Sequence, residues 1–110
     1  MVTITYILSA PAGHENEIID ALRLFKGPTE ARPDCLSCTI SQDVDDPRDV
    51  IYMEEWQSQK ALESHIRSEH YRQLLSIIEI SAAAPEIKLS ATVHANGLEL
   101  IVALRDGNLS

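Results

Sequence analysis

The sequence of 110 residues predicts an α+β fold built on one antiparallel sheet. Three observations support the prediction. Four segments alternate apolar and polar residues, which is the period of a strand with one buried face. Two other segments place apolar residues three and four positions apart, which is the spacing of an amphipathic helix. The segments follow one another in the order β-α-β-β-α-β.

The first part of the chain predicts a strand followed by a helix. Residues 2–9 alternate Val, Ile, Tyr and Leu with mostly hydroxyl side chains, so one face of this strand is apolar. Glu15 and Glu17 suit the first turn of a helix, because the helix dipole favours acidic side chains there. Gly27-Pro28 is expected to end this helix. Residues 29–34 then form a loop.

A β-hairpin and two helical segments are expected next. Residues 36–41 and the β-branched and aromatic run 50–56 read as strands, joined by the polar turn 43–49. Ser58 is a suitable N-cap, because its hydroxyl can accept from the free N–H groups of a first helical turn. Ser68 is expected to act as a second N-cap, so the helical region contains a bend.

The last part of the chain predicts one long strand and a short C-terminal element. Ala82-Ala83-Ala84-Pro85 ends the helices, and residues 87–95 alternate like a strand. The C-terminal element, residues 98–105, could be a helix or a strand, and a helix is favoured. The length suits a single domain covering residues 1–110, with its core in residues 1–95.

This order of elements is the split β-α-β, or ferredoxin-like, arrangement. It predicts a four-stranded antiparallel sheet with helices on one face only. The other face is half polar and must be wet or covered. This half-polar face therefore predicts either an aqueous cavity or a partner sheet. The residues expected on this face are Thr3, Thr5, Ile7, Ser37, Thr39, Ser41, Ser90 and Thr92.

Composition argues against two classes of partner. The formal net charge is −8 and the isoelectric point is about 4.8, whereas nucleic acids and anionic membrane surfaces need a basic patch. No apolar run approaches the roughly 20 residues that a membrane span requires. The first residues lack the basic and apolar regions of a signal peptide. We therefore expect a cytoplasmic protein with no nucleic-acid or membrane partner.

One stretch carries a family resemblance. The pattern Glu54-x-Trp56, Ser58, Ala61-Leu62, His65, Ser68-x-His70-Tyr71 resembles the signature of the antibiotic biosynthesis monooxygenase family. The resemblance covers roughly residues 1–95 and implies a dimeric α+β barrel in which two sheets pack face to face. It therefore implies a homodimer. Members of this family include cofactor-free quinol oxygenases, haem-degrading enzymes, an isomerase and proteins of unknown activity.

Three titratable side chains in this stretch are the candidate catalytic residues. Histidine titrates near neutral pH, so His65 and His70 can each take a proton from a phenol or return one to a peroxide. His65 would be the proton carrier, near the mouth of a cavity; the alternative is a His on the helix surface. His70 could instead be a cap partner. Glu54 shares a strand face with Trp56, and is either an assisting base or one half of an ion pair across the sheet or dimer.

Three aromatic residues are expected to line a substrate pocket: Trp56, Tyr71 and Tyr6. The alternative is that they anchor the core or an interface. No phosphate loop, flavin or nicotinamide fingerprint, or nucleophile elbow is present. We therefore expect no cofactor, with molecular oxygen as co-substrate. His14 and His94 receive no role.

Cys35 and Cys38 form a C-x-x-C motif on an expected strand. Strand alternation would point the two thiols to opposite faces, which argues against a stable disulfide. Two thiols alone do not complete a tetrahedral zinc site, and the His spacing does not favour a metal either. We expect no metal and no disulfide.

The resemblance implies a cofactor-independent monooxygenase that acts on a small phenolic or quinol substrate. Two alternatives remain: a small-molecule-binding or dimerisation module without turnover, and an isomerase of a small carbonyl compound. Haem-degrading relatives use a Trp and an axial His on the helix. The corresponding positions are His65 and Leu75, and this difference argues against haem chemistry.

Overall fold

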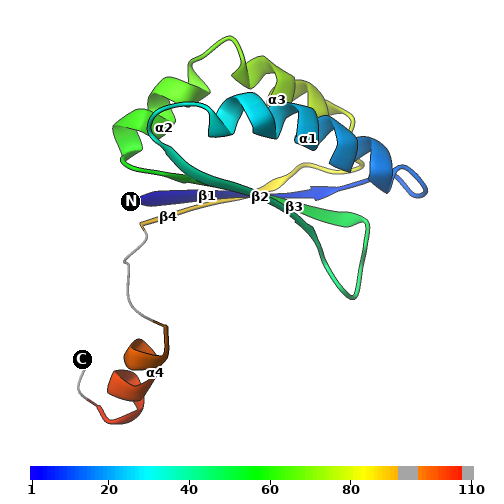
Figure 1. The fold of residues 1–110 in the computed structure, drawn as a ribbon. Coiled ribbons are helices and arrows are strands. Elements are labelled where there is room, and N and C mark those ends of the chain that lie inside the picture. Colours follow the sequence, from blue (N-terminus) through cyan, green and yellow to red (C-terminus); the bar gives the residue numbers. More distant parts are fainter. Residues whose placement is uncertain (92–96, 108–110) are drawn as a thin grey trace.

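The computed structural model describes residues 1–91 and 97–107, and the predicted order of elements is confirmed (Figure 1). Three helices lie over one face of a sheet, and a fourth helix follows near the C-terminus. The elements are β1 (Val2–Ser9), α1 (Glu15–Glu30), β2 (Cys35–Gln42), β3 (Asp49–Trp56), α2 (Gln59–Ile66), α3 (Tyr71–Glu79), β4 (Glu86–Ala91) and α4 (Gly97–Arg105).

The sheet has four antiparallel strands in the order β2-β3-β1-β4, as the ferredoxin-like arrangement requires. Strand β3 lies in the interior of the sheet and pairs with both β1 and β2. In this register Glu54 lies between Ile4 of β1 and Cys38 of β2. Tyr52 likewise pairs with Tyr6. The register therefore gathers polar and aromatic side chains on the helix-facing side of the sheet.

The core lies between that side of the sheet and the helices. Alternate residues of β3 are buried, as are the apolar side chains of β1 and the apolar stripe of α1. Their burial accounts for the strand period and the helical period of the sequence. Its largest fully buried apolar and aromatic members are Trp56, Tyr6, Tyr52, Phe25, Leu8, Ile18, Leu22, Leu74 and Val50.

Helix α1 is longer than predicted. It continues through Gly27 and Pro28 to Glu30, so the prediction that this pair ends the helix is wrong. Proline has no backbone N–H, so the helix continues at Pro28 with one hydrogen bond fewer. The Thr29 hydroxyl adds a bond to the Phe25 carbonyl oxygen, at 2.8 Å. This side chain helps the helix to continue past the proline.

The two short helices after β3 begin differently. Ser58 caps α2 as predicted, because its side-chain oxygen accepts from the Ala61 backbone N–H at 3.1 Å. Ser68 does not cap α3. Its hydroxyl instead donates to the His65 carbonyl oxygen at 2.6 Å, which satisfies one of the free carbonyl groups at the end of α2. Ser68 thus stabilises the bend between the helices by bonding to the end of α2, not to the start of α3.

The C-terminal part agrees with the prediction where it is described. Strand β4 covers Glu86–Ala91, and the predicted continuation through residues 92–95 lies outside the described residues. The C-terminal element is a helix, α4. In Figure 1 it lies below the sheet, away from the other helices, so not every helix covers the same face. Leu98 of α4 is 78% exposed.

The face of the sheet opposite α1, α2 and α3 is half polar, as predicted, and mixes hydroxyl with apolar and charged side chains. At its centre, Met53 pairs with Thr5 on one side and Thr39 on the other. Further along, Ile51 pairs with Ile7 and Ser41. Thr92, also expected here, lies outside the described residues.

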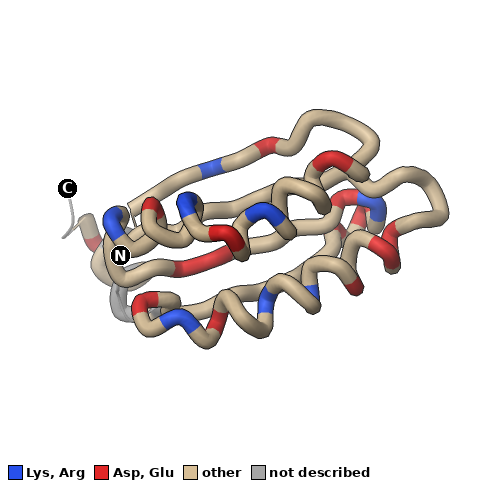
Figure 2. Tube along the Cα trace, turned by 90° about the horizontal axis from the view of Figure 1, so that it is seen from above, with Lys and Arg blue, Asp and Glu red and all other residues tan. Residues whose placement is uncertain are grey.

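Along the helices that the structure describes, acidic and basic residues are interspersed (Figure 2). Arg23 lies 3.6 Å from Asp20, and Lys26 lies 2.7 Å from Glu30, each one helical turn away. Within the described residues, no helix has the length and apolar character needed to span a bilayer.

Candidate functional site

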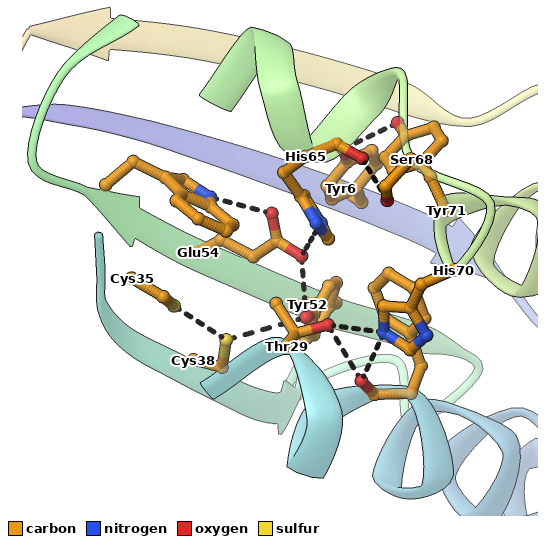
Figure 3. A network of polar contacts seen from close by, with 12 residues as sticks. Tyr6, Thr29, Cys35, Cys38, Tyr52, Glu54, His65, Ser68, His70 and Tyr71 are labelled. Atoms are coloured by element: carbon orange, nitrogen blue, oxygen red, sulfur yellow. Dashed lines mark hydrogen bonds and ion pairs between the residues drawn. The ribbon is translucent and has the colours of Figure 1, made fainter. Parts of the chain in front are cut away.

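A buried carboxylate lies at the centre of the candidate site (Figure 3). Glu54 of β3 is fully buried between the sheet and the helices. Its Oε2 atom lies 2.7 Å from the Tyr52 hydroxyl and 3.2 Å from His65 Nε2, and its Oε1 accepts from Trp56 Nε1–H at 3.0 Å. Three side chains therefore surround one carboxylate, which is the condition under which a charge is tolerated in a core.

These contacts define which groups donate. Trp56 Nε1 can only donate, and the Tyr52 hydroxyl donates to Glu54. An ionised Glu54 is an acceptor only, so His65 Nε2 carries a hydrogen and donates to it. The arrangement places the proton of a neutral His65 on Nε2 and leaves the lone pair on Nδ1.

His65 is buried rather than exposed. It lies in the last turn of α2 with 0% of its surface exposed, so neither a surface position nor the mouth of an open cavity describes it. Its ring stacks on Trp56, with 4.6 Å between the ring centroids, and meets Tyr71 edge-on at 5.4 Å. His65 Nδ1 is the one buried side-chain nitrogen or oxygen of the described residues without a hydrogen-bond partner. The Nδ1 atom is thus both unpartnered and enclosed.

A second polar contact lies beside this pair. The hydroxyl oxygens of Tyr6 and Tyr71 are 2.8 Å apart, and either can be the donor. Burial raises the pKa of Tyr6 and of Tyr71 above the ordinary tyrosine value, and the negative charge of Glu54 raises both further. Burial and Glu54 raise the pKa of Tyr52 in the same way. All three tyrosines of the chain are therefore neutral hydrogen-bonding groups at neutral pH.

The raised tyrosine pKa values predict alkaline unfolding. At pH values below 10.0, the ordinary tyrosine pKa, these tyrosines are protonated in both the folded and the unfolded state. They therefore contribute no pH dependence to stability in that range. Above it, only the unfolded state loses the protons, and stability falls as pH rises. Tyr6 and Tyr52 together give a loss of about 3 kcal/mol per pH unit.

Urea denaturation at neutral pH, and again one unit above the ordinary tyrosine pKa of 10.0, measures this loss. Tyrosinate absorbance, followed with circular dichroism, shows whether ionisation accompanies unfolding. Ionisation of all three tyrosines in the folded protein near their ordinary pKa would contradict the buried arrangement.

His70 connects two helices instead of joining the Glu54 contacts. Its Nε2 atom lies 2.9 Å from Thr29 Oγ1 and 3.2 Å from the carbonyl oxygen of Phe25, both on α1. Its ring stacks on Phe25 at 4.3 Å. A carbonyl oxygen can only accept, so Nε2 is the donor here. His70 is thus placed as an anchor between the start of α3 and the end of α1, with its ring 6.2 Å from that of His65.

The two cysteines lie on the same side of β2. Their Sγ atoms are 3.6 Å apart, so the expectation that strand alternation holds them apart is wrong. The cause is a β-bulge. Cys35 pairs with Trp56 and Ser37 pairs with Glu55, so Leu36 has no partner on β3. One extra residue reverses the alternation, and Cys35 and Cys38 then face the helices together. Both are free thiols.

The six predicted site residues are close together, but they do not surround an open pocket. Tyr6, Glu54, Trp56, His65 and Tyr71 pack against one another, and only Tyr71 has appreciable exposure, at 8%. Two cavities lie elsewhere. One, of about 320 Å³, lies between α1 and β2 and is lined by Ile19, Arg23, Lys26, Ile40, Ser41 and Gln42. The other, of about 230 Å³, lies between α1 and α3.

Two members of this site, Tyr52 and Thr29, are not among the predicted site residues. Tyr52 lies two positions before Glu54 on the same strand, and this spacing places both side chains on one face. Thr29 was assigned to a loop because Pro28 precedes it. No signal in the sequence shows that its hydroxyl meets His70.

Among residues 1–91 and 97–107, no three His, Cys, Asp or Glu side chains are grouped closely enough to hold an ion.

The fold and the site together define a ferredoxin-like α+β protein with a buried carboxylate–histidine pair. The family model described as antibiotic biosynthesis monooxygenase matches residues 1–75. This match covers more than half of the chain, and the chain therefore belongs to the antibiotic biosynthesis monooxygenase family.

Solved structures share the fold at low sequence identity. A structure described as an antibiotic biosynthesis monooxygenase is 22% identical, with a TM-score of 0.75 over 86% of this chain and 100% of its own. Rv0793 from Mycobacterium tuberculosis is 19% identical, with a TM-score of 0.76 over 86% and 96%. PA3566 from Pseudomonas aeruginosa is 25% identical, with a TM-score of 0.73 over 84% and 94%. A comparison with curated proteins finds no match.

Proposed function

We propose that this protein is a cofactor-independent monooxygenase that oxidises a small phenolic or quinol substrate with molecular oxygen. One observation carries the proposal. His65, held by Glu54 through Nε2, keeps an unpartnered Nδ1 atom in a water-excluded interior. Membership of the antibiotic biosynthesis monooxygenase family supports the same reaction class.

The chemistry needs only a positioned base. A phenol has a pKa near that of tyrosine, about 10, so its reactive anion is scarce at neutral pH. His65 Nδ1 takes the phenolic proton, and the Glu54 carboxylate stabilises the resulting imidazolium. The electron-rich anion then reduces O₂ directly. For a simple phenol, one oxygen atom enters the product as a quinone oxygen, and the other leaves as water. No electrons from a cofactor are needed.

Substrate access in this proposal requires movement of Tyr71. Tyr71 is the most exposed of the packed site residues and begins α3, just after the bend held by Ser68. Turning its ring away opens the side of His65 that it contacts and breaks the bond to the Tyr6 hydroxyl. Both hydroxyl groups are then free to bind a substrate oxygen. Trp56 provides a flat wall on the other side of the imidazole.

Oxygen uptake tests the proposal. The protein is dialysed against a chelator and assayed with a panel of hydroquinones and polycyclic phenols, with no flavin or metal added. We expect uptake of oxygen and formation of quinone in equal amounts. If no member of the panel is turned over above the rate without protein, the oxygenase proposal is wrong.

A second candidate function is a dimerisation or binding module without turnover. The complete burial of Tyr6, Glu54, Trp56 and His65 favours it, because a filled interior needs no substrate to be stable. Isomerisation of a small carbonyl compound would use the same free Nδ1 without oxygen. Binding measured under anaerobic conditions, with and without conversion of the ligand, separates these two functions from the oxygenase.

The protein is further proposed to be a cytoplasmic homodimer that packs through the face of the sheet opposite α1, α2 and α3. Light scattering at micromolar concentration is expected to give twice the chain mass of 12.2 kDa. Met53→Glu places a charge at the centre of this face and is expected to yield monomers. Leu24→Glu, on the exposed side of α1, is the matched control and should stay dimeric. A wild-type monomer would refute this assembly.

A further inference from the structure

The two cysteines lie close enough for a covalent bond to form with little movement. Cys35 Sγ and Cys38 Sγ are 3.6 Å apart, whereas a disulfide requires about 2.0 Å. Side-chain rotation over about 1.5 Å can close this gap. The bulge at Leu36, not a turn or a helix end, brings the two thiols together.

The pair also differs in accessibility, as a redox pair requires. Cys35 is partly exposed, at the beginning of β2, and Cys38 is buried below the helices. An oxidant reaches Cys35 first, and Cys38 lies behind it. Burial raises the pKa of both thiols, so oxidation is expected to be slow and stoichiometric, unlike that of a peroxidase cysteine.

Cys38 connects the pair to the buried carboxylate. Its Sγ lies 3.6 Å from the Tyr52 hydroxyl oxygen, and that hydroxyl donates to Glu54 Oε2 at 2.7 Å. Glu54 in turn holds Trp56 and His65. Figure 3 shows this continuous line of contacts from Cys35 to His65. Formation of the Cys35–Cys38 bond draws the Cys38 sulfur away from Tyr52. It also removes the hydrogen of the Cys38 thiol.

We propose that Cys35 and Cys38 form a redox modification site, a reversible disulfide whose state is transmitted through Tyr52 to the Glu54–His65 pair. Hydrogen peroxide is the oxidant. The Cys35 sulfur attacks the O–O bond, which breaks to give a sulfenic acid and one water. The Cys38 sulfur then attacks Cys35 Sγ, the S–O bond breaks, and a second water leaves. Two thiols lose two electrons and two protons, and the peroxide becomes two waters.

Thiol counting and intact mass test the bond. Peroxide treatment of the wild type is expected to reduce the titre from two free thiols per chain to none and to lower the mass by two hydrogens. Dithiothreitol should restore both. The control variant Cys38→Ser/Thr39→Cys keeps two thiols but moves one to the opposite face, and it should form no internal disulfide. Retention of both thiols in the treated, folded wild type overturns the proposal, as does separate overoxidation of each cysteine.

Trp56 fluorescence tests the transmission. Trp56 is the only tryptophan, contacts Glu54 directly and pairs with Cys35 across the strands, so its emission should change on oxidation of the wild type and recover on reduction. Tyr52→Phe lacks the connecting hydroxyl. It is expected to form the disulfide and to keep only the part of the response that comes from Cys35 itself, so its fluorescence change should be smaller than that of the wild type. An equal response in this variant would mean that the signal does not pass through Tyr52. Neither measurement depends on the oxygenase activity.

Discussion

Replacement of His65 by Ala is expected to slow quinol oxidation by about 100-fold or more, the usual loss when a general base is removed. His65 is the group whose free Nδ1 can accept the phenolic proton, and Glu54 stabilises its cation. Oxygen uptake by wild type and variant, with the same hydroquinone panel, measures the loss. The substrate anion must then form without help, so the variant should recover activity as pH rises.

Two further variants separate catalysis from folding. His65→Gln retains an amide that can donate to Glu54 but supplies no base, so it should be folded and slow. His14 is exposed, so His14→Ala is the matched His-to-Ala control. Its rate of quinol oxidation should equal that of the wild type. Circular dichroism monitors the fold of each. If His65→Gln is folded and oxidises quinol within a factor of two of wild type, His65 is not the base.

Replacement of Glu54 by Ala is expected to lower the free energy of unfolding by about 3 kcal/mol or more, because three buried donors lose the acceptor they share. Tyr52, Trp56 and His65 all use this carboxylate. Its removal leaves their buried polar groups without an acceptor, and each such group costs about 1–3 kcal/mol. Urea denaturation monitored by circular dichroism measures the change.

The neighbouring residue offers a direct control. Glu55→Ala makes the same chemical change one residue further on, where the side chain faces the other side of the sheet between Thr3 and Ser37. We expect its effect to stay within about 0.5 kcal/mol, as is usual outside buried networks. Similar losses for Glu54→Ala and Glu55→Ala would show that the buried contacts of Glu54 contribute little.

The fold could be predicted because local signals agree with its tertiary arrangement. The alternation in residues 2–9 and 50–56 matches the burial of β1 and β3, and the side chain of Ser58 caps α2 as its position suggested. The end of α1 could not be predicted, because the contact between Thr29 and His70 joins residues 41 positions apart.

The candidate site was predictable in membership but not in arrangement. Residue types near the end of β3 singled out Glu54 and His65, yet their contact depends on how α2 packs back against β3. The sequence also suggested walls around an open pocket, whereas the aromatic rings fill the interior themselves. The β-bulge at Leu36 has no glycine to indicate it, so the meeting of the two cysteines had no local signal.

The bulge also affects which surfaces can associate. Strands β2 and β4 are the outer strands of the sheet, and each presents backbone N–H and C=O groups on its free side. Such edges attract strands from other chains and promote aggregation. The bulge interrupts the regular row of groups on β2, and charged Lys88 lies within β4. Both edges thus resist edge-to-edge pairing, which disfavours open-ended strand addition.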